Sequence, residues 1–206
     1  MTDTLYALLN ERILLLDGGF GTMVQGYGLT EADFRGERFR DAGVQLRGCN
    51  DLLALTRPDV VREIHEKYLQ AGADIIETDS FNANAVSLKD YRLEAYAYEM
   101  SRAAAAAARA AADAFTARNP QKPRFVAGSM GPTNRTASMS ANVGNPASRE
   151  ITFRELVEAY TEQARGLMDG GADILLVETV FDTLNAKAAL YAIDTLAERT
   201  GREIPV

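Results

Sequence analysis

The stretch Gly72-Ala73-Asp74-Ile75-Ile76-Glu77-Thr78 decides the fold, because it returns as Gly171-Ala172-Asp173-Ile174-Leu175-Leu176-Val177-Glu178-Thr179. In both copies a glycine follows a helical pattern, a short apolar segment comes next, and a Glu-Thr pair ends it. A short, nearly all-apolar segment is typical of a strand that is covered on both faces of a parallel sheet. The echo favours a repeated βα unit, but Gly-Ala-Asp is a common start of a buried strand, so chance similarity between two βα units remains an equal alternative.

The same alternation of short apolar and longer amphipathic segments runs along the whole chain. The pattern predicts strands at residues 13–16, 74–77, 124–127 and 174–177, and helices at residues 58–71, 88–118, 152–169 and 183–200. Thr56 is a candidate cap of the helix that starts at Pro58, and Gly72 is its expected end. Residues 203–206 resemble the start of a fifth strand. We therefore predict an α/β fold with four βα units and the beginning of another.

Composition limits both the size and the partners of this chain. Its 206 residues, 47% of them apolar, suit a single domain over residues 1–206. A net charge of −7 argues against nucleic acid as a partner, because a phosphate backbone needs a basic face. We find no signal peptide and no apolar run of membrane-spanning length, so we expect a cytoplasmic protein with no membrane partner.

Two segments are longer than ordinary βα loops, which have about two to six residues. They cover residues 18–57 and 129–151, and the second begins with the turn-forming sequence Gly131-Pro132-Thr133-Asn134-Arg135-Thr136. Long loops at the carboxyl ends of parallel strands commonly build binding sites. We therefore expect the functional site at this end of the sheet.

The sequence Asp17-Gly18-Gly19-Phe20-Gly21-Thr22 follows the first predicted strand. Its glycines leave room for a ligand close to the backbone, and consecutive amides there can hold a carboxylate or a phosphate. A dinucleotide fingerprint is disfavoured, because Val24 stands where the third glycine belongs and no helix is predicted there. A simple tight turn remains the alternative.

Carboxylates end two of the predicted strands. Glu77 and Glu178 could face one pocket together with Asp17, an arrangement that suits a substrate ammonium group, a metal ion or acid–base catalysis. The alternative for each carboxylate is a structural one, as a cap or as the partner of an arginine.

Three other reactive residue types have simpler explanations. His65 lies beside the apolar stripe of a predicted outer helix, so a structural role is expected. Cys49 has no nearby histidine to activate it and is expected to be a small buried thiol. Ser129 lies in Gly128-Ser129-Met130-Gly131, which lacks the Gly-x-Ser-x-Gly spacing of a nucleophile elbow.

Taken together, several segments resemble the homocysteine-binding domain of cobalamin-dependent methionine synthase, within the homocysteine S-methyltransferase family. The resemblance covers essentially the whole chain, in order, and its segments are residues 15–23, 31–39, 72–78, 131–136 and 178–187. The segment 17–22 resembles the wider family. Residues 34–39 and 131–136 resemble the cobalamin-dependent enzymes more narrowly.

The resemblance implies a (β/α)8 TIM-type barrel, present here as roughly its first half, in which zinc binds the homocysteine sulfur. It implies methyl transfer from methylcobalamin, with the cobalamin and folate domains of the same enzyme as partners. Asp17 and Glu178 would then bind the substrate ammonium group, and the amides around Gly18 and Gly19 would bind its carboxylate. Asn82 is a weaker candidate for the same site.

The chain departs from the family in its cysteines. The family holds zinc with three cysteines from later strands, whereas this chain has only Cys49, which matches none of them. The ligands would lie beyond Val206, since a complete barrel needs about 250 residues. We therefore expect no zinc ligand and no catalytic residue within residues 1–206, and no methyl transfer by these residues alone.

Two alternatives to the methionine synthase interpretation remain. One is a cobalamin-independent homocysteine S-methyltransferase that uses a small donor such as a betaine or a methylated sulfur compound. The other is a non-catalytic homocysteine-binding module whose half-barrel pairs with a second copy, because an open half-barrel exposes apolar edges.

Overall fold

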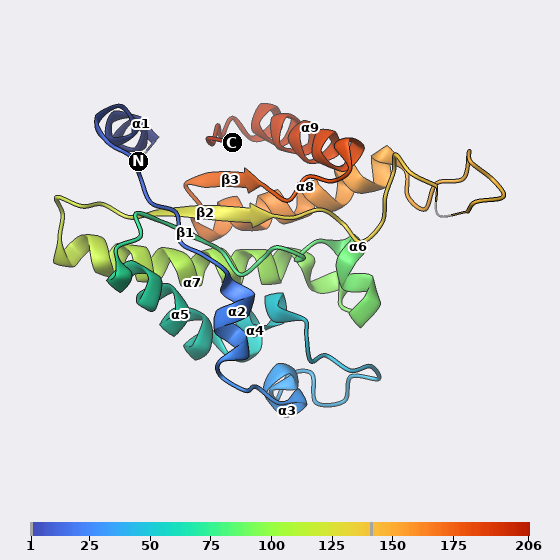
Figure 1. The fold of residues 1–206 in the computed structure, drawn as a ribbon, viewed down its shortest axis with the longest axis horizontal. Helices are drawn as coiled ribbons and strands as arrows, with labels where there is room; N and C mark the ends of the chain where they lie inside the picture. The colour runs from blue at the N-terminus through green and yellow to red at the C-terminus, as the bar shows by residue number, and fades with distance from the viewer. Residues whose placement is uncertain (1, 141) are drawn as a thin grey trace.

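The computed structural model describes residues 2–140 and 142–206 as an α/β fold around a small parallel sheet (Figure 1). The longer helices are α1 (Thr2–Glu11), α5 (Pro58–Ala71), α7 (Ala97–Arg118), α8 (Phe153–Gly170) and α9 (Thr183–Thr200). The short ones are α2 (Phe20–Gln25), α3 (Glu31–Arg35), α4 (Leu53–Thr56), α6 (Ala85–Leu88) and the 3-10 turns η1 (Asn50–Leu52), η2 (Lys89–Tyr91) and η3 (Glu94–Tyr96). The strands are β1 (Ile75–Glu77), β2 (Phe125–Met130) and β3 (Ile174–Val177).

The strands lie in the order β1-β2-β3 and all pairs are parallel. Their register joins Glu77 to Ala127 and Ala127 to Ile174, so the carboxyl ends of the strands point to one edge of the sheet. This arrangement confirms the three predicted strands at 74–77, 124–127 and 174–177, with β2 extending to Met130. It also brings the residues that follow β1 and β3 to the same end of the fold.

The two outer edges of the sheet are less regular than predicted. The segment 13–16 forms only an isolated bridge, between Leu16 and Ile75, rather than a strand. Residues 203–206 are likewise not a strand, although the Pro205 carbonyl accepts a bond of 2.9 Å from the Leu175 N–H. Ile13 is 84% exposed and Val206 is 62% exposed, so both edges present apolar side chains to solvent. Exposed apolar edges are what the half-barrel prediction implies.

Helices α5, α7, α8 and α9 pack against one another in chain order and form the outer layer. Figure 1 shows this layer curving from α5 and α7 on one side of the strands to α9 beyond β3. Close packing of α7 on α8 depends on Gly170, where an added Cβ would lie 2.4 Å from the Arg102 carbonyl oxygen and 2.6 Å from the Ala105 Cβ. The alanine-rich face of α7 therefore serves as a surface for close helix contact.

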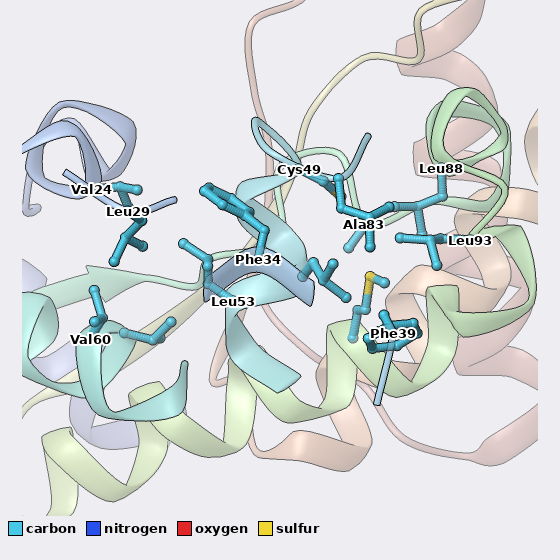
Figure 2. Close-up of a cluster of buried hydrophobic side chains, with 14 of the residues drawn as sticks. Val24, Leu29, Phe34, Phe39, Cys49, Leu53, Val60, Ala83, Leu88 and Leu93 are labelled. Atoms are coloured by element: carbon cyan, nitrogen blue, oxygen red, sulfur yellow. The ribbon is translucent and has the colours of Figure 1, made fainter. Parts of the chain in front are cut away.

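The first long segment folds into a small helical layer instead of remaining an irregular loop. Its apolar side chains form a buried cluster with those of α5 and α7 (Figure 2). Figure 2 shows Val24, Leu29 and Phe34 grouped near Leu53 and Val60. Short helix α2 begins at Phe20, within the glycine sequence, so the expectation that no helix opens there is wrong.

Two further predictions about helix ends are wrong. The helix expected over 88–118 begins only at Ala97, because Arg92 has a left-handed backbone (φ 56°) and Leu88 and Leu93 turn into the buried cluster. Thr56 does not cap α5, since it ends α4 and its hydroxyl donates to the Leu52 carbonyl. Gly72 does end α5, with φ 116°.

None of the helices that the structure describes is both long enough and apolar enough to cross a lipid bilayer.

Candidate functional site

A polar pocket of about 460 Å³ lies at the carboxyl ends of the strands. It brings together the glycine sequence after the first segment, the residues that follow β1, and Glu178 after β3. Its lining residues are Gly18, Gly19, Phe20, Gly21, Gly48, Asn50, Asp51, Glu77, Thr78, Asp79, Ser80, Phe81, Asn82, Ser129 and Glu178. No lysine or arginine is among these described lining residues, so the pocket is acidic.

The Glu178 carboxylate is held in place by the neighbouring strand. The Ser129 hydroxyl donates to Glu178 Oε1 at 2.5 Å, and Ser129 itself is buried. The Ser129 N–H donates to Thr78 Oγ1 at 2.9 Å, and the Ser80 hydroxyl donates to the Ser129 carbonyl at 2.8 Å. These bonds tie the ends of β1, β2 and the residue after β3 into one rigid group.

The Asp17 carboxylate is fixed by the backbone of β1. Both of its oxygens accept the Glu77 N–H at 3.1 Å. Burial raises the pKa of Asp17 to about 7, and the nearby charges of Glu77 and Glu178 act in the same direction. Asp17 is thus bonded to the lining residue Glu77 but is not itself one of the residues that line the pocket.

Glu77 and Glu178 lie in the same pocket with like charges. Burial, and next the charge of Glu178, raises the pKa of Glu77 to about 7. Two carboxylates that lie close together without a cation repel each other, and a positively charged ligand would offset this repulsion. The site is thus suited to a cationic group.

The other end of the pocket holds two buried carboxylates that sequence reasoning missed. The Asn82 N–H donates to Asp51 Oδ1 at 2.7 Å, and burial nevertheless raises the pKa of Asp51 to about 6. Burial and the charge of Asp51 raise the pKa of Asp79 well above its usual range. Asp51 comes from the first long segment, and only the folding of that segment onto the sheet brings it here.

The structure places the predicted substrate-binding residues as a group. Gly18, Gly19, Glu178 and Asn82 line the pocket, and Asp17 is bonded to its wall. The side chain of Asn82 is exposed, and its backbone amide is already used by Asp51. Ser129 was noticed in the sequence only for its resemblance to a nucleophile elbow, whereas its hydroxyl in the structure orients Glu178.

The residues with expected structural roles lie in the core. His65 is fully buried and its ring lies 5.4 Å from that of Phe20, and burial lowers the pKa of His65 to about 4. Cys49 is buried, and burial followed by the charge of Asp51 raises the pKa of its thiol.

Zinc, which the resemblance implies, does not fit the residues of this chain. Residues 2–140 and 142–206 contain no group of three histidine, cysteine, aspartate or glutamate side chains placed to hold a metal ion. The thiolate form that zinc prefers is disfavoured at Cys49, because this thiol is buried next to Asp51.

Comparisons with known proteins place this geometry in context. The family model described as "Homocysteine S-methyltransferase" matches residues 14–206. The structure is similar to the homocysteine methyltransferase MmuM from Escherichia coli in its metallated form, with 26% sequence identity and a TM-score of 0.69 over 92% of this chain. The oxidized form of MmuM matches with the same identity and TM-score over 96% of this chain, and the apo form with a TM-score of 0.61 over 95%.

The chain spans 62% of the length of the metallated and oxidized MmuM chains and 59% of the apo chain. This partial coverage agrees with the predicted α/β barrel class, present as part of a barrel.

Proposed function

Because the chain belongs to the homocysteine S-methyltransferase family, we propose that its acidic pocket binds the amino-acid end of homocysteine in a protein that methylates the homocysteine sulfur. The observation that carries this proposal is the pocket itself, in which Glu178, Gly18 and Gly19 meet at the carboxyl ends of the strands. Parallel α/β folds bind their ligands at this end of the sheet.

The pocket offers complementary groups for both ends of a zwitterion. Asp17 and Glu178 provide carboxylates for the ammonium group, and Ser129 keeps the Glu178 carboxylate in a fixed orientation. The backbone amides around Gly18 and Gly19 are assigned to the substrate carboxylate, since an unsubstituted backbone allows close approach. Asn82 has the weakest claim, because its amide already donates to Asp51.

This chain's own residues bind and orient the substrate. A bound zinc ion would favour the thiolate form of the homocysteine sulfur, but its ligands are not found among the described residues of this chain. We therefore assign no catalytic residue within it.

For the methyl donor, we favour methylcobalamin, as in methionine synthase with its folate and cobalamin domains. Residues 34–39 and 131–136 support this choice, since they resemble the cobalamin-dependent enzymes more than the wider family. A cobalamin-independent reaction with a betaine or a methylated sulfur compound is the second candidate, because the glycine sequence at 17–22 is shared with the wider family.

Binding measurements with the full-length protein test the substrate site. We expect Asp17→Asn and Glu178→Gln each to weaken homocysteine binding by about 1 to 3 kcal/mol, since each loses a charge-assisted hydrogen bond to the ammonium group. Isothermal titration calorimetry measures this change. Glu158→Gln, on the exposed side of α8, serves as the matched control and should bind as the wild type does. Equal affinities in all four proteins would reject the site.

Methionine formation by the full-length protein separates the donors. We expect product from homocysteine with methylcobalamin and none with a betaine or a methylated sulfur compound. Product from a small donor alone would favour the second candidate. Homocysteine binding with no product from any donor would favour the non-catalytic module.

A further inference from the structure

Glu77 lines the acidic pocket but is not one of the two carboxylates, Asp17 and Glu178, that are assigned above to the ammonium group. It is the last residue of β1, and its side chain accepts no hydrogen bond from any described residue, whereas Asp17 and Glu178 each accept one or more. We propose that Glu77 is the third carboxylate ligand of the substrate ammonium group, and that ammonium binding makes this cluster release protons. The inference rests on the proposed function, because it concerns the same site.

Glu77 is connected to both of the other carboxylate residues, to Asp17 through its backbone and to Glu178 through the pocket that they line. The Glu77 N–H donates to both carboxylate oxygens of Asp17 at 3.1 Å, so the Asp17 carboxylate lies next to the backbone of Glu77. Glu77 and Glu178 line one pocket, and their charges act on each other. A primary ammonium group has three N–H donors, so Glu77 can accept the one that Asp17 and Glu178 leave free.

Among the residues that the structure describes, none that lines the pocket with Glu77 is a cation. The titratable groups that face it are Asp17 from the first segment, Glu178 after β3, Tyr68 from α5, and Asp51 and Asp79 on the far wall of the pocket. None of these groups carries a positive charge, and burial together with Asp17 and Glu77 raises the pKa of the Tyr68 hydroxyl, which therefore stays neutral. A bound ammonium group would be the first cation in the cluster.

Proton release is expected because Asp17 and Glu77 are buried carboxyl groups without a cationic partner among the described residues. Burial and like charges raise the pKa of both Asp17 and Glu77 to about 7, so each is partly protonated near neutral pH. An ammonium group favours the ionised carboxylates and lowers these pKa values when it binds. The protons go to solvent or buffer, and the carboxylates remain as anionic ligands.

Calorimetry of the full-length protein with L-methionine tests the proposal. Methionine has the same amino-acid end as homocysteine but no thiol proton, so any proton released comes from the protein. The titration is repeated in buffers of different ionisation enthalpy, and the dependence of the observed heat on buffer gives the number of protons released. At pH 6 we expect release of about one proton, and near pH 8.5 almost none, because the carboxylates are then already ionised.

Glu77→Gln tests the residue directly. The substitution keeps the shape of a side chain that has no hydrogen-bond partner among the described residues, so the variant should keep the fold. We expect about tenfold weaker methionine binding and clearly reduced proton release at pH 6. Glu158→Gln should match the wild type in both measurements, and 4-(methylthio)butyrate, which lacks the ammonium group, should cause no proton release.

The outcomes separate this inference from the proposed function. If Asp17→Asn and Glu178→Gln weaken methionine binding while Glu77→Gln changes neither affinity nor proton release, the role of Glu77 is wrong and the substrate site stands. If the wild type binds neither methionine nor homocysteine, both proposals fail.

Discussion

The two βα units that share the Gly-Ala-Asp sequence are built alike where their strands begin. The Asp74 N–H donates to the Leu15 carbonyl and the Asp74 carboxylate accepts the Leu15 N–H, at 2.8 and 3.0 Å. Asp173 makes the same two bonds with Val126, at 2.8 Å each. Each aspartate therefore hydrogen-bonds the start of its own strand to the preceding extended segment. The repeated Gly-Ala-Asp sequence thus corresponds to a repeated pair of hydrogen bonds.

The same two units differ where their strands end. Glu178 accepts a hydrogen bond from Ser129, whereas the Glu77 side chain accepts none from the described residues. The strand starts are thus alike in hydrogen bonding and serve stability, while the strand ends diverge and form the pocket. Within one repeated unit, the start of the strand therefore supports the fold, whereas its end lines the candidate pocket.

The largest expected difference between the two units is the loss of stability when the aspartate at the start of each strand is replaced. Asp74 is 1% exposed and forms a two-bond pair with Arg12, whereas Asp173 is 12% exposed and pairs with Arg109. We expect Asp74→Ala to lower the free energy of unfolding by about 3 kcal/mol, since it leaves the Leu15 N–H without its side-chain partner and breaks a partly buried ion pair with Arg12. Asp173→Ala should cost about 1 to 2 kcal/mol.

Chemical denaturation of both variants of the full-length protein measures these differences. Asp113→Ala removes an exposed partner of Arg109 and serves as the control, with an expected change below about 0.5 kcal/mol. Equal costs at Asp74 and Asp173 would show that burial of the pair does not set its contribution.

The next effect is a contrast in pH dependence between the two strand ends. Burial and Glu178 raise the pKa of Glu77 from 4.5 to about 7, so the folded state holds a proton more tightly than the unfolded state. Its stabilising contribution is present below pH 4.5 and is lost as the pH rises through 7. The stability difference between the wild type and Glu77→Gln should therefore change by about 2 kcal/mol between pH 4.5 and pH 8, after allowance for solvent screening at a half-buried group.

Asp74 should show the opposite sign. Its pKa is held at about 2, below the usual 3.8, because hydrogen bonds from Arg12 and Leu15 and the charges of Lys122 and Arg12 outweigh its burial. Its contribution is present above pH 3.8 and is lost as the pH falls through 2. Unfolding curves of Asp74→Asn and Glu77→Gln at pH 3, 4.5 and 8 compare the two; a parallel pH dependence in both variants would contradict the distinction between strand start and strand end.

The sequence predicted the repeated core because local patterns determine it. The apolar segments of β1, β2 and β3 and the glycine that ends α5 are readable from neighbouring residues. The helix expected from residue 88 failed, because Leu88 and Leu93 are drawn into a cluster formed with residues far away in the chain. The strand at 13–16 is reduced to one bridge, although the Asp74 and Ile75 N–H groups both donate to the Leu15 carbonyl.

Only those parts of the pocket that depend on local sequence patterns were predicted. Residues close behind a predicted strand, such as Glu178 and Gly18, were found from their position in the sequence. Asp51 was not, because its place in the pocket depends on how the first long segment folds over α5 and α7. The second long segment was expected to behave similarly, but it has few apolar residues, and Met139 and Val143 are exposed. The second segment is held mainly by hydrogen bonds instead, such as those from the Ala137 and Ser138 N–H groups to Asp182.

The smallest effect concerns the glycines that end the two helices before β1 and β3. Gly72 and Gly171 have φ values of 116° and 100°, which residues with a Cβ rarely adopt, so alanine should cost about 1 kcal/mol at either position. An added Cβ at Gly72 has only Lys122 Nζ nearby, at 4.0 Å, whereas at Gly171 it would lie 3.1 Å from the Arg109 Cγ. Because Arg109 also forms an ion pair with Asp173 at the start of β3, displacing Arg109 disturbs that ion pair. Gly171→Ala should therefore lower the free energy of unfolding by a few tenths of a kcal/mol more than Gly72→Ala. Thermal unfolding of the two variants and of Gly171→Ala combined with Arg109→Ala resolves this difference. If the extra cost persists without the Arg109 side chain, it does not arise from that contact.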